Sequence, residues 1–393
     1  MGDDGHIHRM IPVVQELAAR GAVPHVFTAA PFREAVERAG GRFHDLFDGR
    51  SVDEADPETM PPACRYVSFA GCYAEDVCRE LQEIRPSLIV YDTFAYIARA
   101  AAQIMDLPHV NVCAGHNVSL ASLDELLGVL GEHVAVSPIC DRWVDVLRER
   151  HGLEDASPWS WMATQSEHLN LYCEPEHYLD PANRETFEPI AFFGSLHRDI
   201  DASPDAAGKP HFNGSGPRVY VSFGTFVWRL FADEALAAQR VLSEALAERD
   251  GSALLSLGRR PLTPEVRREL EAPNVVLADY VDQRRVLDEA DAFVTHHGLN
   301  STHEAVWKGV PMISYPFFWD QPLLAHKCAE LDTAVPLVSA PLDPLTKQDV
   351  HDALDRVASE DETMRAALAT AREWEAQVIA ERPAVVDRML ALA

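Results

Sequence analysis

The segment FVTHHGLNSTHEAVWKGVPMISYPFFWDQ, from Phe293 to Gln321, decides the fold. An apolar run at 292–295 predicts a buried strand, and a helical stretch begins near Ser301 after a short polar loop. A second apolar run at 311–316 predicts another strand. A strand, a helix and a second strand in this order form a βαβ unit, in which the two strands are parallel.

The same alternation runs through the whole chain. In the first half, strands are predicted at 22–29, 87–92, 108–113 and 168–173, with helices at 8–20 and 94–105. In the second half, strands are predicted at 218–224, 253–258, 274–279, 292–295, 311–316 and 334–338, with helices at 233–248 and 363–378. Several strands are continuously apolar, as in a parallel sheet covered on both faces. The sequence therefore predicts an α/β protein with two doubly wound, Rossmann-like domains facing each other across a cleft.

The expected boundary between these domains is a segment without periodicity at 199–216, rich in Asp, Pro, Gly and Ser, which is typical of a linker. The first domain is then 1–198 and the second is 217–365. The helical remainder at 366–393 is expected to pack back toward the first domain.

The beginning of the chain does not fit a complete doubly wound domain. It opens with MGDDGHIHRM, a glycine-containing loop that leads directly into a helix, whereas such a domain begins with a strand that is normally central. Either that strand lies upstream of Met1, which we expect, or the domain is built unusually.

Composition excludes several classes of protein. Apolar residues make up 47% of the chain and charged residues 24%, the balance of a globular protein, and no apolar run is long enough to span a membrane. The net charge of −28 opposes binding to nucleic acid or anionic lipid, and no basic patch larger than Arg284–Arg285 offsets it. Seven cysteines without a C-x-x-C pair, and no visible signal peptide, favour the cytoplasm.

The loop between the strand at 292–295 and the helix after it has the chemistry of a diphosphate site. Ligands of doubly wound sheets bind at the carboxyl ends of strands, where a helix N-terminus offers free N–H groups and a partial positive charge. Gly298 lets an anion approach the backbone, and either His296 or His297 supplies a further donor. The alternative is a capping box, in which Ser301 and Glu304 only begin the helix.

Other phosphate-binding motifs are absent. The sequence has neither a G-x-G-x-x-G after a strand nor a G-x-x-x-x-G-K-[ST], so nicotinamide dinucleotides and P-loop chemistry are not indicated. Gly224 and Thr225, at the end of the strand predicted at 218–224, occupy a second strand end where a phosphate could bind.

The segment 293–321, together with YVDQRRVL (280–287) and VYVSFGT (219–225), resembles the donor-binding signature of nucleotide-sugar-dependent glycosyltransferases with the GT-B fold. These are the plant secondary-product and the bacterial macrolide and antibiotic types. Weaker similarity covers 5–21 and 86–99, so the resemblance spans most of both halves. It implies these donor-binding residues: Thr225, Tyr280, Val281, Gln283, His296, Gly298, Asn300, Ser301, Glu304, Asp320 and Gln321.

The resemblance also implies a role for each part of this set. His296 and the residues that follow it bind the diphosphate, while Gln283 and Glu304 hold the ribose. The pair Asp320–Gln321 binds the sugar hydroxyls. Tyr280 stands where the family has a tryptophan that stacks on the base, and this departure leaves both uridine and thymidine open.

A catalytic pair is implied by the same family. His6, which follows a glycine in the first loop, matches the general base, and Asp92 at the end of a predicted strand matches the group that orients it. His8 is an equally near alternative to His6. For Asp92 the alternative is an N-cap of the helix predicted after it.

The expected reaction is transfer of a sugar from a UDP- or TDP-sugar to a hydroxyl of a lipophilic natural product, with inversion and without a metal or other cofactor. The acceptor is expected between Cys113 and Met162, where 120–130 and 157–162 offer apolar and aromatic surface. Two other functions stay open, a nucleotide-sugar epimerase and a non-catalytic partner protein that only binds a nucleotide sugar. Both a monomer and a homodimer are compatible with the sequence.

Overall fold

The computed structural model describes residues 4–58, 61–128, 138–197, 211–213 and 215–393. The chain divides into two compact units, one made of Met1–His197 with Val378–Ala393 and the other of Arg198–Gln377. Every strand pair in the three sheets is parallel, which confirms the α/β class predicted from the apolar runs. The linker expected at 199–216 lies mostly outside the described residues.

The second unit contains one six-stranded sheet with the order β12-β11-β10-β7-β8-β9. Its strands are β7 (Arg218–Ser222), β8 (Ser252–Ser256), β9 (Val275–Ala278), β10 (Ala292–Thr295), β11 (Met312–Ser314) and β12 (Ala334–Pro336). The first strand along the chain, β7, is therefore central, between β10 and β8. All residues of β8, β10 and β11 are buried, because helices cover both faces of the sheet.

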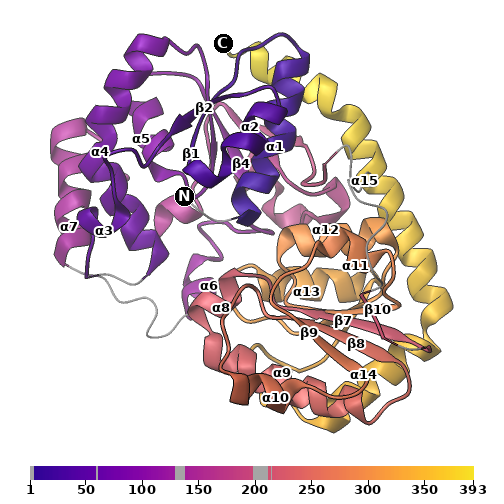
Figure 1. Cartoon of the computed structure of the whole chain (residues 1–393). Coiled ribbons are helices and arrows are strands. Elements are labelled where there is room, and N and C mark those ends of the chain that lie inside the picture. Colours follow the sequence, from indigo (N-terminus) through magenta and orange to yellow (C-terminus); the bar gives the residue numbers. More distant parts are fainter. Residues whose placement is uncertain (1–3, 59–60, 129–137, 198–210, 214) are drawn as a thin grey trace. The chain divides into compact units, whose positions relative to one another are not determined.

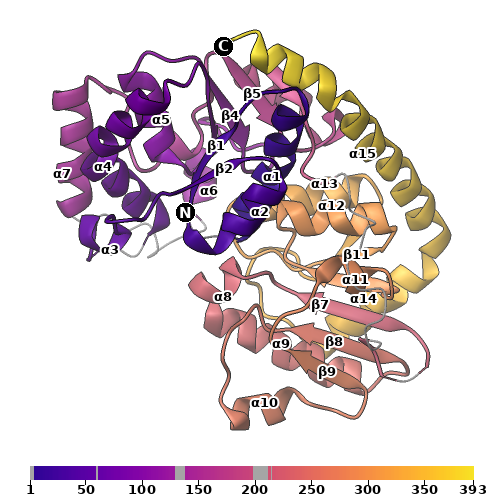
Figure 2. The ribbon, with the colours of Figure 1, turned by 45° about the horizontal axis from the view of Figure 1, so that its top comes forward.

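The helices of the second unit follow the strands in turn. They are α8 (Phe226–Leu230), α9 (Ala232–Ala247), α10 (Pro264–Leu270), α11 (Gln283–Leu287), α12 (Leu299–Lys308), α13 (Gln321–Glu330) and α14 (Lys347–Ser359). Figures 1 and 2 show α9 and α10 on one face of the sheet and α12 and α13 on the other. This distribution follows from right-handed crossovers on either side of a central first strand.

The first unit contains two separate sheets. A two-stranded sheet pairs β1 (His25–Thr28) with β2 (Arg42–Asp45). A four-stranded sheet has the order β3-β4-β5-β6, with β3 (Ile89–Asp92), β4 (His109–Cys113), β5 (Leu169–Tyr172) and β6 (Ile190–Phe192). The sequence analysis did not place β2 or β6. The first is largely polar and the second has only three residues, so neither produces an apolar run.

Helices cover these strands. They are α1 (Asp4–Ala19), α2 (Arg33–Arg38), α3 (Val52–Ala55), α4 (Pro62–Ile84), α5 (Tyr96–Ile104), α6 (Leu123–Gly128) and α7 (Pro138–Asp145). The main core of the unit is formed where α4 packs on α5 and α7, around residues such as Phe69, Tyr96 and Trp161. In Figure 1, α1 and α2 lie beside β1 and β2, whereas α4 and α5 lie together in another part of the unit.

The last helix, α15 (Asp361–Leu390), begins in the second unit and ends in the first. In the first unit its buried Arg382 donates from Nε to the carbonyl of Phe193 at 2.7 Å and from Nη2 to the carbonyl of Leu196 at 2.6 Å.

In the described part of the chain, no helix is long and apolar enough to cross a bilayer. All seven cysteines lie within that part, and none of them forms a disulfide.

Candidate active site

The first part of the candidate site is a histidine–aspartate pair in the first unit. Helix α1 begins at Asp4 and carries His6 in its first turn, while β3 ends at Asp92. The His6 Nδ1 lies 3.0 Å from Oδ1 and 2.9 Å from Oδ2 of Asp92. The ring also packs edge-on against Phe94, with centroids 4.9 Å apart. The two residues that the family resemblance nominated are thus in direct contact.

Asp92 is a buried carboxylate with several partners. Burial by itself raises the pKa of Asp92, but His6, Arg9 and the Phe94 amide together outweigh burial, so that this pKa is lowered. Arg9 donates from Nη1 to Oδ2 at 3.4 Å, and the Phe94 N–H donates to Oδ1 at 3.0 Å. The carboxylate therefore stays ionised beside the imidazole.

The structure decides between the alternatives for this pair. His8 is exposed and its ring contacts that of His197, with centroids 5.9 Å apart, so it is not the histidine beside Asp92. The N-cap interpretation of Asp92 is wrong, because the N-cap of α5 is Ala95 and has no side-chain cap. Arg9 was missed by the sequence analysis. Its only signal was its position three residues after His6, on the same face of a helix.

The second part of the candidate site lies in the second unit, at the carboxyl ends of its strands. Thr225 follows β7, the Tyr280–Gln283 segment follows β9, the His296–Ser301 segment follows β10, and the Asp320–Gln321 pair follows β11. Because all six strands are parallel, these ends share one edge of the sheet. The predicted donor-binding residues are therefore grouped by the topology.

His296 is enclosed by two glycines. A Cβ built on Gly298 would lie 2.4 Å from the His296 Nε2, and one built on Gly224 would lie 2.9 Å from it. Any side chain at either position would displace the ring. Burial lowers the pKa of His296 to about 4, so the ring is neutral at pH 7. The two glycines fix this ring as well as opening the backbone to a ligand.

His297, the other histidine of the pair, has a different place. Its Nδ1 lies 3.1 Å from Thr302 Oγ1 and its Nε2 lies 2.7 Å from Ser314 Oγ, and the residue is fully buried. It also adopts a positive φ of 58°, which turns the chain between β10 and α12. Both ring nitrogens are thus engaged within the protein, and of the two histidines His296 is the candidate for a ligand.

Helix α12 begins earlier than predicted, at Leu299. Its N-cap is Gly298, without a side-chain cap, so the capping box of Ser301 and Glu304 does not form. Instead, Gln283 donates from Nε2 to Ser301 Oγ at 3.1 Å and to Glu304 Oε2 at 2.7 Å. Burial raises the pKa of Glu304, although the hydrogen bond from Gln283 acts in the opposite direction. Three predicted donor-binding residues thus form one cluster.

Tyr280 is the exposed end of the donor-binding set. Half of its surface is exposed, and the guanidinium of Arg259 lies over its ring, 4.0 Å from the centroid. Arg259 has a positive φ of 65° and was not predicted, since its proximity to Tyr280 arises only from the fold. Val281, Thr225 and Asn300 are all partly buried.

Asp320 and Gln321 form the last pair. Both are almost buried, and Asp320 is the N-cap of α13 without a side-chain cap. The Gln321 Oε1 accepts from the backbone N–H of Phe317 at 2.9 Å and of Phe318 at 3.3 Å. The Gln321 carbonyl is therefore held by its own loop.

The segments predicted to contact an acceptor give a mixed result. Trp161 is fully buried and packs against Tyr96, so it belongs to the core. Leu120, in contrast, is 53% exposed, which is unusual for a large apolar residue in this chain. Residues 129–130 of the 120–130 segment lie outside the described residues.

Comparison with known proteins indicates the kind of enzyme. Residues 184–370, which include most of the second unit, match the model of the UDP-glucoronosyl and UDP-glucosyl transferase family. The chain is 26% identical over 349 residues to the oleandomycin glycosyltransferase of Streptomyces antibioticus, covering 81% of this chain and 73% of that protein.

Solved structures share the fold over the whole chain. The glycotransferase of kitacinnamycin has a TM-score of 0.76 at 22% identity, with 99% of this chain and 96% of that one covered. The glycosyltransferase VinC, solved in complex with DTDP, has a TM-score of 0.65 at 19% identity, with coverages of 98% and 97%. The predicted recognition is confirmed: this chain is a glycosyltransferase with the GT-B fold.

Proposed function

We propose that this enzyme transfers a sugar from a UDP- or dTDP-sugar to a hydroxyl of a lipophilic natural product, with inversion and without a metal ion. The observation that carries the proposal is the His6–Asp92 contact of 2.9 Å, in a chain whose second unit holds a buried, neutral His296 beside a helix N-terminus. A base and a leaving-group site are the two parts that such a displacement requires.

His6 acts as the general base. Since Nδ1 faces the Asp92 carboxylate, the neutral tautomer protonated on Nδ1 donates to Asp92 and leaves Nε2 free to take the proton of the acceptor hydroxyl. Asp92 then stabilises the imidazolium that forms. Arg9 helps to keep this carboxylate ionised.

The diphosphate leaves from the β10–α12 loop. We expect the N-terminus of the ten-residue helix α12 to bind the diphosphate together with Asn300, Ser301 and Thr225. His296 enters this set as a neutral donor. The negative charge of a bound diphosphate would favour protonation of this ring, whose pKa burial lowers to about 4.

The rest of the donor is bound by the neighbouring loops. The Gln283–Glu304 pair accepts the ribose hydroxyls, and Tyr280, backed by Arg259 and followed by Val281, stacks on the base. Asp320 and Gln321 hold the hydroxyls of the transferred sugar. The solved complex of VinC with DTDP supports thymidine, while the matching family model supports uridine.

Metal independence is proposed from the groups at the phosphates. In the described ranges, the one cluster of three potential metal ligands is His109, Glu167 and His168, which belongs to the first unit and not to the donor-binding loops. The leaving-group charge is instead met by N–H donors.

A cytoplasmic location is proposed from the seven cysteines that form no disulfide.

The experiment is a transfer assay with UDP-glucose and dTDP-glucose against a panel of macrolide, polyketide and phenolic acceptors. We expect acceptor-dependent release of UDP or dTDP, and an α-linked donor should give a β-glycoside by its anomeric coupling in the NMR spectrum. A product with retained configuration would contradict the single displacement. Conversion of the nucleotide sugar without any acceptor would favour the epimerase, and no conversion at all would favour the non-catalytic partner.

A further inference from the structure

Three potential metal ligands come together at the amino ends of two neighbouring strands of the first unit. His109 is the first residue of β4, and Glu167 and His168 come directly before β5. One ligand atom from each of the three side chains lies within 4.8 Å of the other two. Two imidazole nitrogens and one carboxylate oxygen form a donor set that proteins use to bind Zn²⁺.

The strand register explains why the two histidines are neighbours. Strands β4 and β5 are parallel, and Val110 pairs with Leu169, so the positions one residue earlier lie side by side. These positions are His109 and His168, at the ends of strands that are about 4.8 Å apart. Their rings meet edge to face, with centroids 4.6 Å apart and an interplanar angle of 71°. The fold thus brings together two imidazoles that are distant in the sequence.

Hydrogen bonds fix both backbones at this place. The Ser166 hydroxyl donates to the carbonyl of His109 at 2.7 Å and accepts from the N–H of His168 at 3.1 Å. Asn170 holds Ser166 in turn, because its Oδ1 accepts from the Ser166 N–H at 2.7 Å and its Nδ2 donates to the Ser166 carbonyl at 2.8 Å. The backbone that carries the two histidines is therefore positioned before any ion binds, as a precise metal site requires.

The ring nitrogens are in states that suit a metal ion. His109 is buried, and its Nδ1 donates to the carbonyl of Leu107 at 3.1 Å, which selects the neutral tautomer with a lone pair on Nε2. The Nδ1 of His168 is shielded from solvent and has no hydrogen-bond partner among the described residues. A buried ring nitrogen without a partner is uncommon in folded proteins, and a bound cation would supply one.

We propose that His109, Glu167 and His168 bind one Zn²⁺ ion, with water in the fourth position. In a tetrahedral site, bonds of about 2.0–2.2 Å place neighbouring ligand atoms about 3.4 Å apart. The three ligand atoms must therefore approach one another by no more than about 1.4 Å. Glu167 is exposed and free to rotate toward the ion, whereas the two rings are already in contact.

The nearest described cation does not prevent this binding. Arg99 interacts electrostatically with His109. Its guanidinium, however, is paired, since Nη2 donates to Asp155 Oδ2 at 3.0 Å and Nη1 donates to the carbonyl of Thr164 at 3.3 Å. The positive charge of Arg99 is thus offset by Asp155, and the carboxylate of Glu167 adds a negative charge to the cluster itself.

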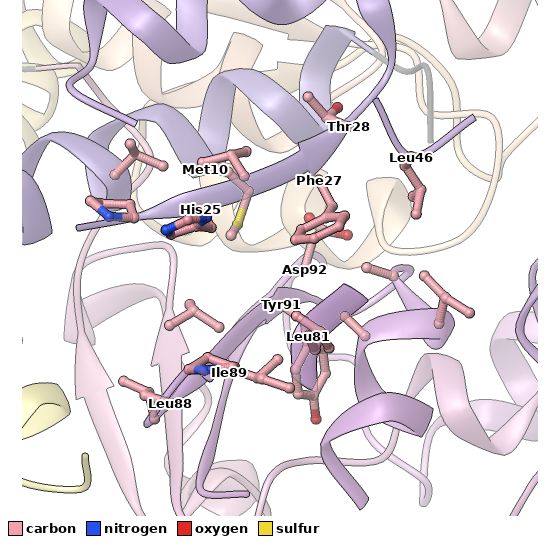
Figure 3. Close-up of a pocket in the computed structure, with 18 of the residues that line it drawn as sticks. Met10, His25, Phe27, Thr28, Leu46, Leu81, Leu88, Ile89, Tyr91 and Asp92 are labelled. Carbon is pink, nitrogen blue, oxygen red and sulfur yellow. The ribbon is translucent and has the colours of Figure 1, made fainter. Parts of the chain in front are cut away.

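The ion would stabilise the fold and would take no part in sugar transfer. His109 pairs with Ile89 at the start of β3. Asp92, which contacts His6, is at the end of the same strand and pairs with Val112. Figure 3 shows Ile89 and Asp92 at opposite ends of β3. Three residues along a strand span about 10 Å, whereas a bond to zinc is about 2 Å long, so the site is compatible with metal-independent transfer.

The test measures zinc binding by the full chain, purified without a polyhistidine tag and freed of metal with a chelator. Zn²⁺ is titrated by calorimetry, and Tm is measured with and without the ion. Glu167→Gln and His168→Gln each remove one ligand, and the first changes only an exposed side chain. The matched control is His326→Gln, because that histidine is 75% exposed on α13 in the second unit.

We expect one Zn²⁺ per chain, a higher Tm with zinc, and binding at least about tenfold weaker in both Glu167→Gln and His168→Gln. Co²⁺ in place of Zn²⁺ should give the visible absorption of a four-coordinate site in the original protein and in His326→Gln, but not in the other two variants. Absence of zinc binding by the original protein would overturn the proposal, and so would equal binding by all four proteins.

Discussion

His6 in the first unit and His296 in the second both lie near the carboxyl end of a parallel strand, yet their surroundings are opposite in character. His6 is part-exposed and faces the ionised carboxylate of Asp92. His296 is buried between Gly224 and Gly298, and desolvation keeps it neutral. The comparison shows that desolvation is enough to lower the pKa of a histidine, as it does at His296.

The largest effect is expected from His6→Ala. Loss of the general base should lower kcat by about 100- to 10,000-fold, while the donor KM stays close to that of the unmodified enzyme. The measurement is acceptor-dependent nucleotide release. The matched control is His8→Ala, because His8 lies on the same helix but is exposed, and it should retain nearly full activity. Turnover by His6→Ala within a few-fold of the original would remove the base assignment.

His296→Ala tests the other side of the comparison. Removing one donor to the leaving group should lower kcat by about 100- to 1,000-fold and should weaken donor binding as well. The same assay measures both, with the donor concentration varied. His326→Ala is the control, since that side chain is 75% exposed on α13. Unchanged kinetics of His296→Ala would mean that the diphosphate binds elsewhere.

Stability should depend on pH through His296. Its pKa is about 4 in the folded protein and about 6.5 when unfolded, so the unfolded chain binds the proton more readily between these values. The neutral His296 therefore contributes to the free energy of unfolding above pH 6.5. This contribution is lost as the pH falls toward 4, by about 3 kcal/mol in total. The free energy of unfolding, measured with denaturant from pH 7 to pH 4, should fall less steeply for His296→Gln than for the original protein. Parallel curves would contradict the low pKa.

Glu304→Gln sharpens the role assigned to the Gln283 cluster. The substitution keeps the shape of the side chain but removes a charged acceptor for the ribose hydroxyls, which should raise the donor KM about tenfold with a smaller change in kcat. Inhibition of the transfer reaction by UDP and by UMP gives a second measure. The substitution should weaken the binding of both nucleotides alike. If only the sugar-bearing donor is affected, Glu304 contacts the sugar instead.

The smallest effect is expected at Tyr280. Because the ring is half exposed, Tyr280→Ala should weaken nucleoside diphosphate binding only about fivefold, near the lower limit for base stacking. Tyr280→Phe retains the ring and should bind as the original protein does. A loss in the Phe variant equal to that in the Ala variant would indicate a role for the hydroxyl rather than for stacking.

The parts of the fold that could be predicted are those with long apolar runs. The strand at 292–295 has the predicted bounds, and the central strands of both units lie within their predicted ranges. The 23-residue helix α4 was not predicted, although buried residues such as Ala70, Val77 and Leu81 recur along it at helical spacing. Strand β2 was missed because three of its four residues, Arg42, His44 and Asp45, are polar or charged, and Arg42 is exposed.

The residues of the candidate site also differ in whether the sequence could predict them. Residues such as Thr225, His296 and Asp320 could be nominated because a βα pattern fixes which positions follow a strand end. Arg9 and Arg259 could not, since their importance lies in contacts with Asp92 and Tyr280 that only the fold creates.

The central claim is a division of labour between the two histidines, and calorimetric titration of UDP and dTDP in the absence of acceptor tests it most directly. His6→Ala should bind the preferred nucleotide within about twofold of the original protein, because the role proposed for the base is to act on the acceptor hydroxyl. His296→Ala should bind it at least about tenfold more weakly. Normal binding by His296→Ala together with lost binding by His6→Ala would contradict the account.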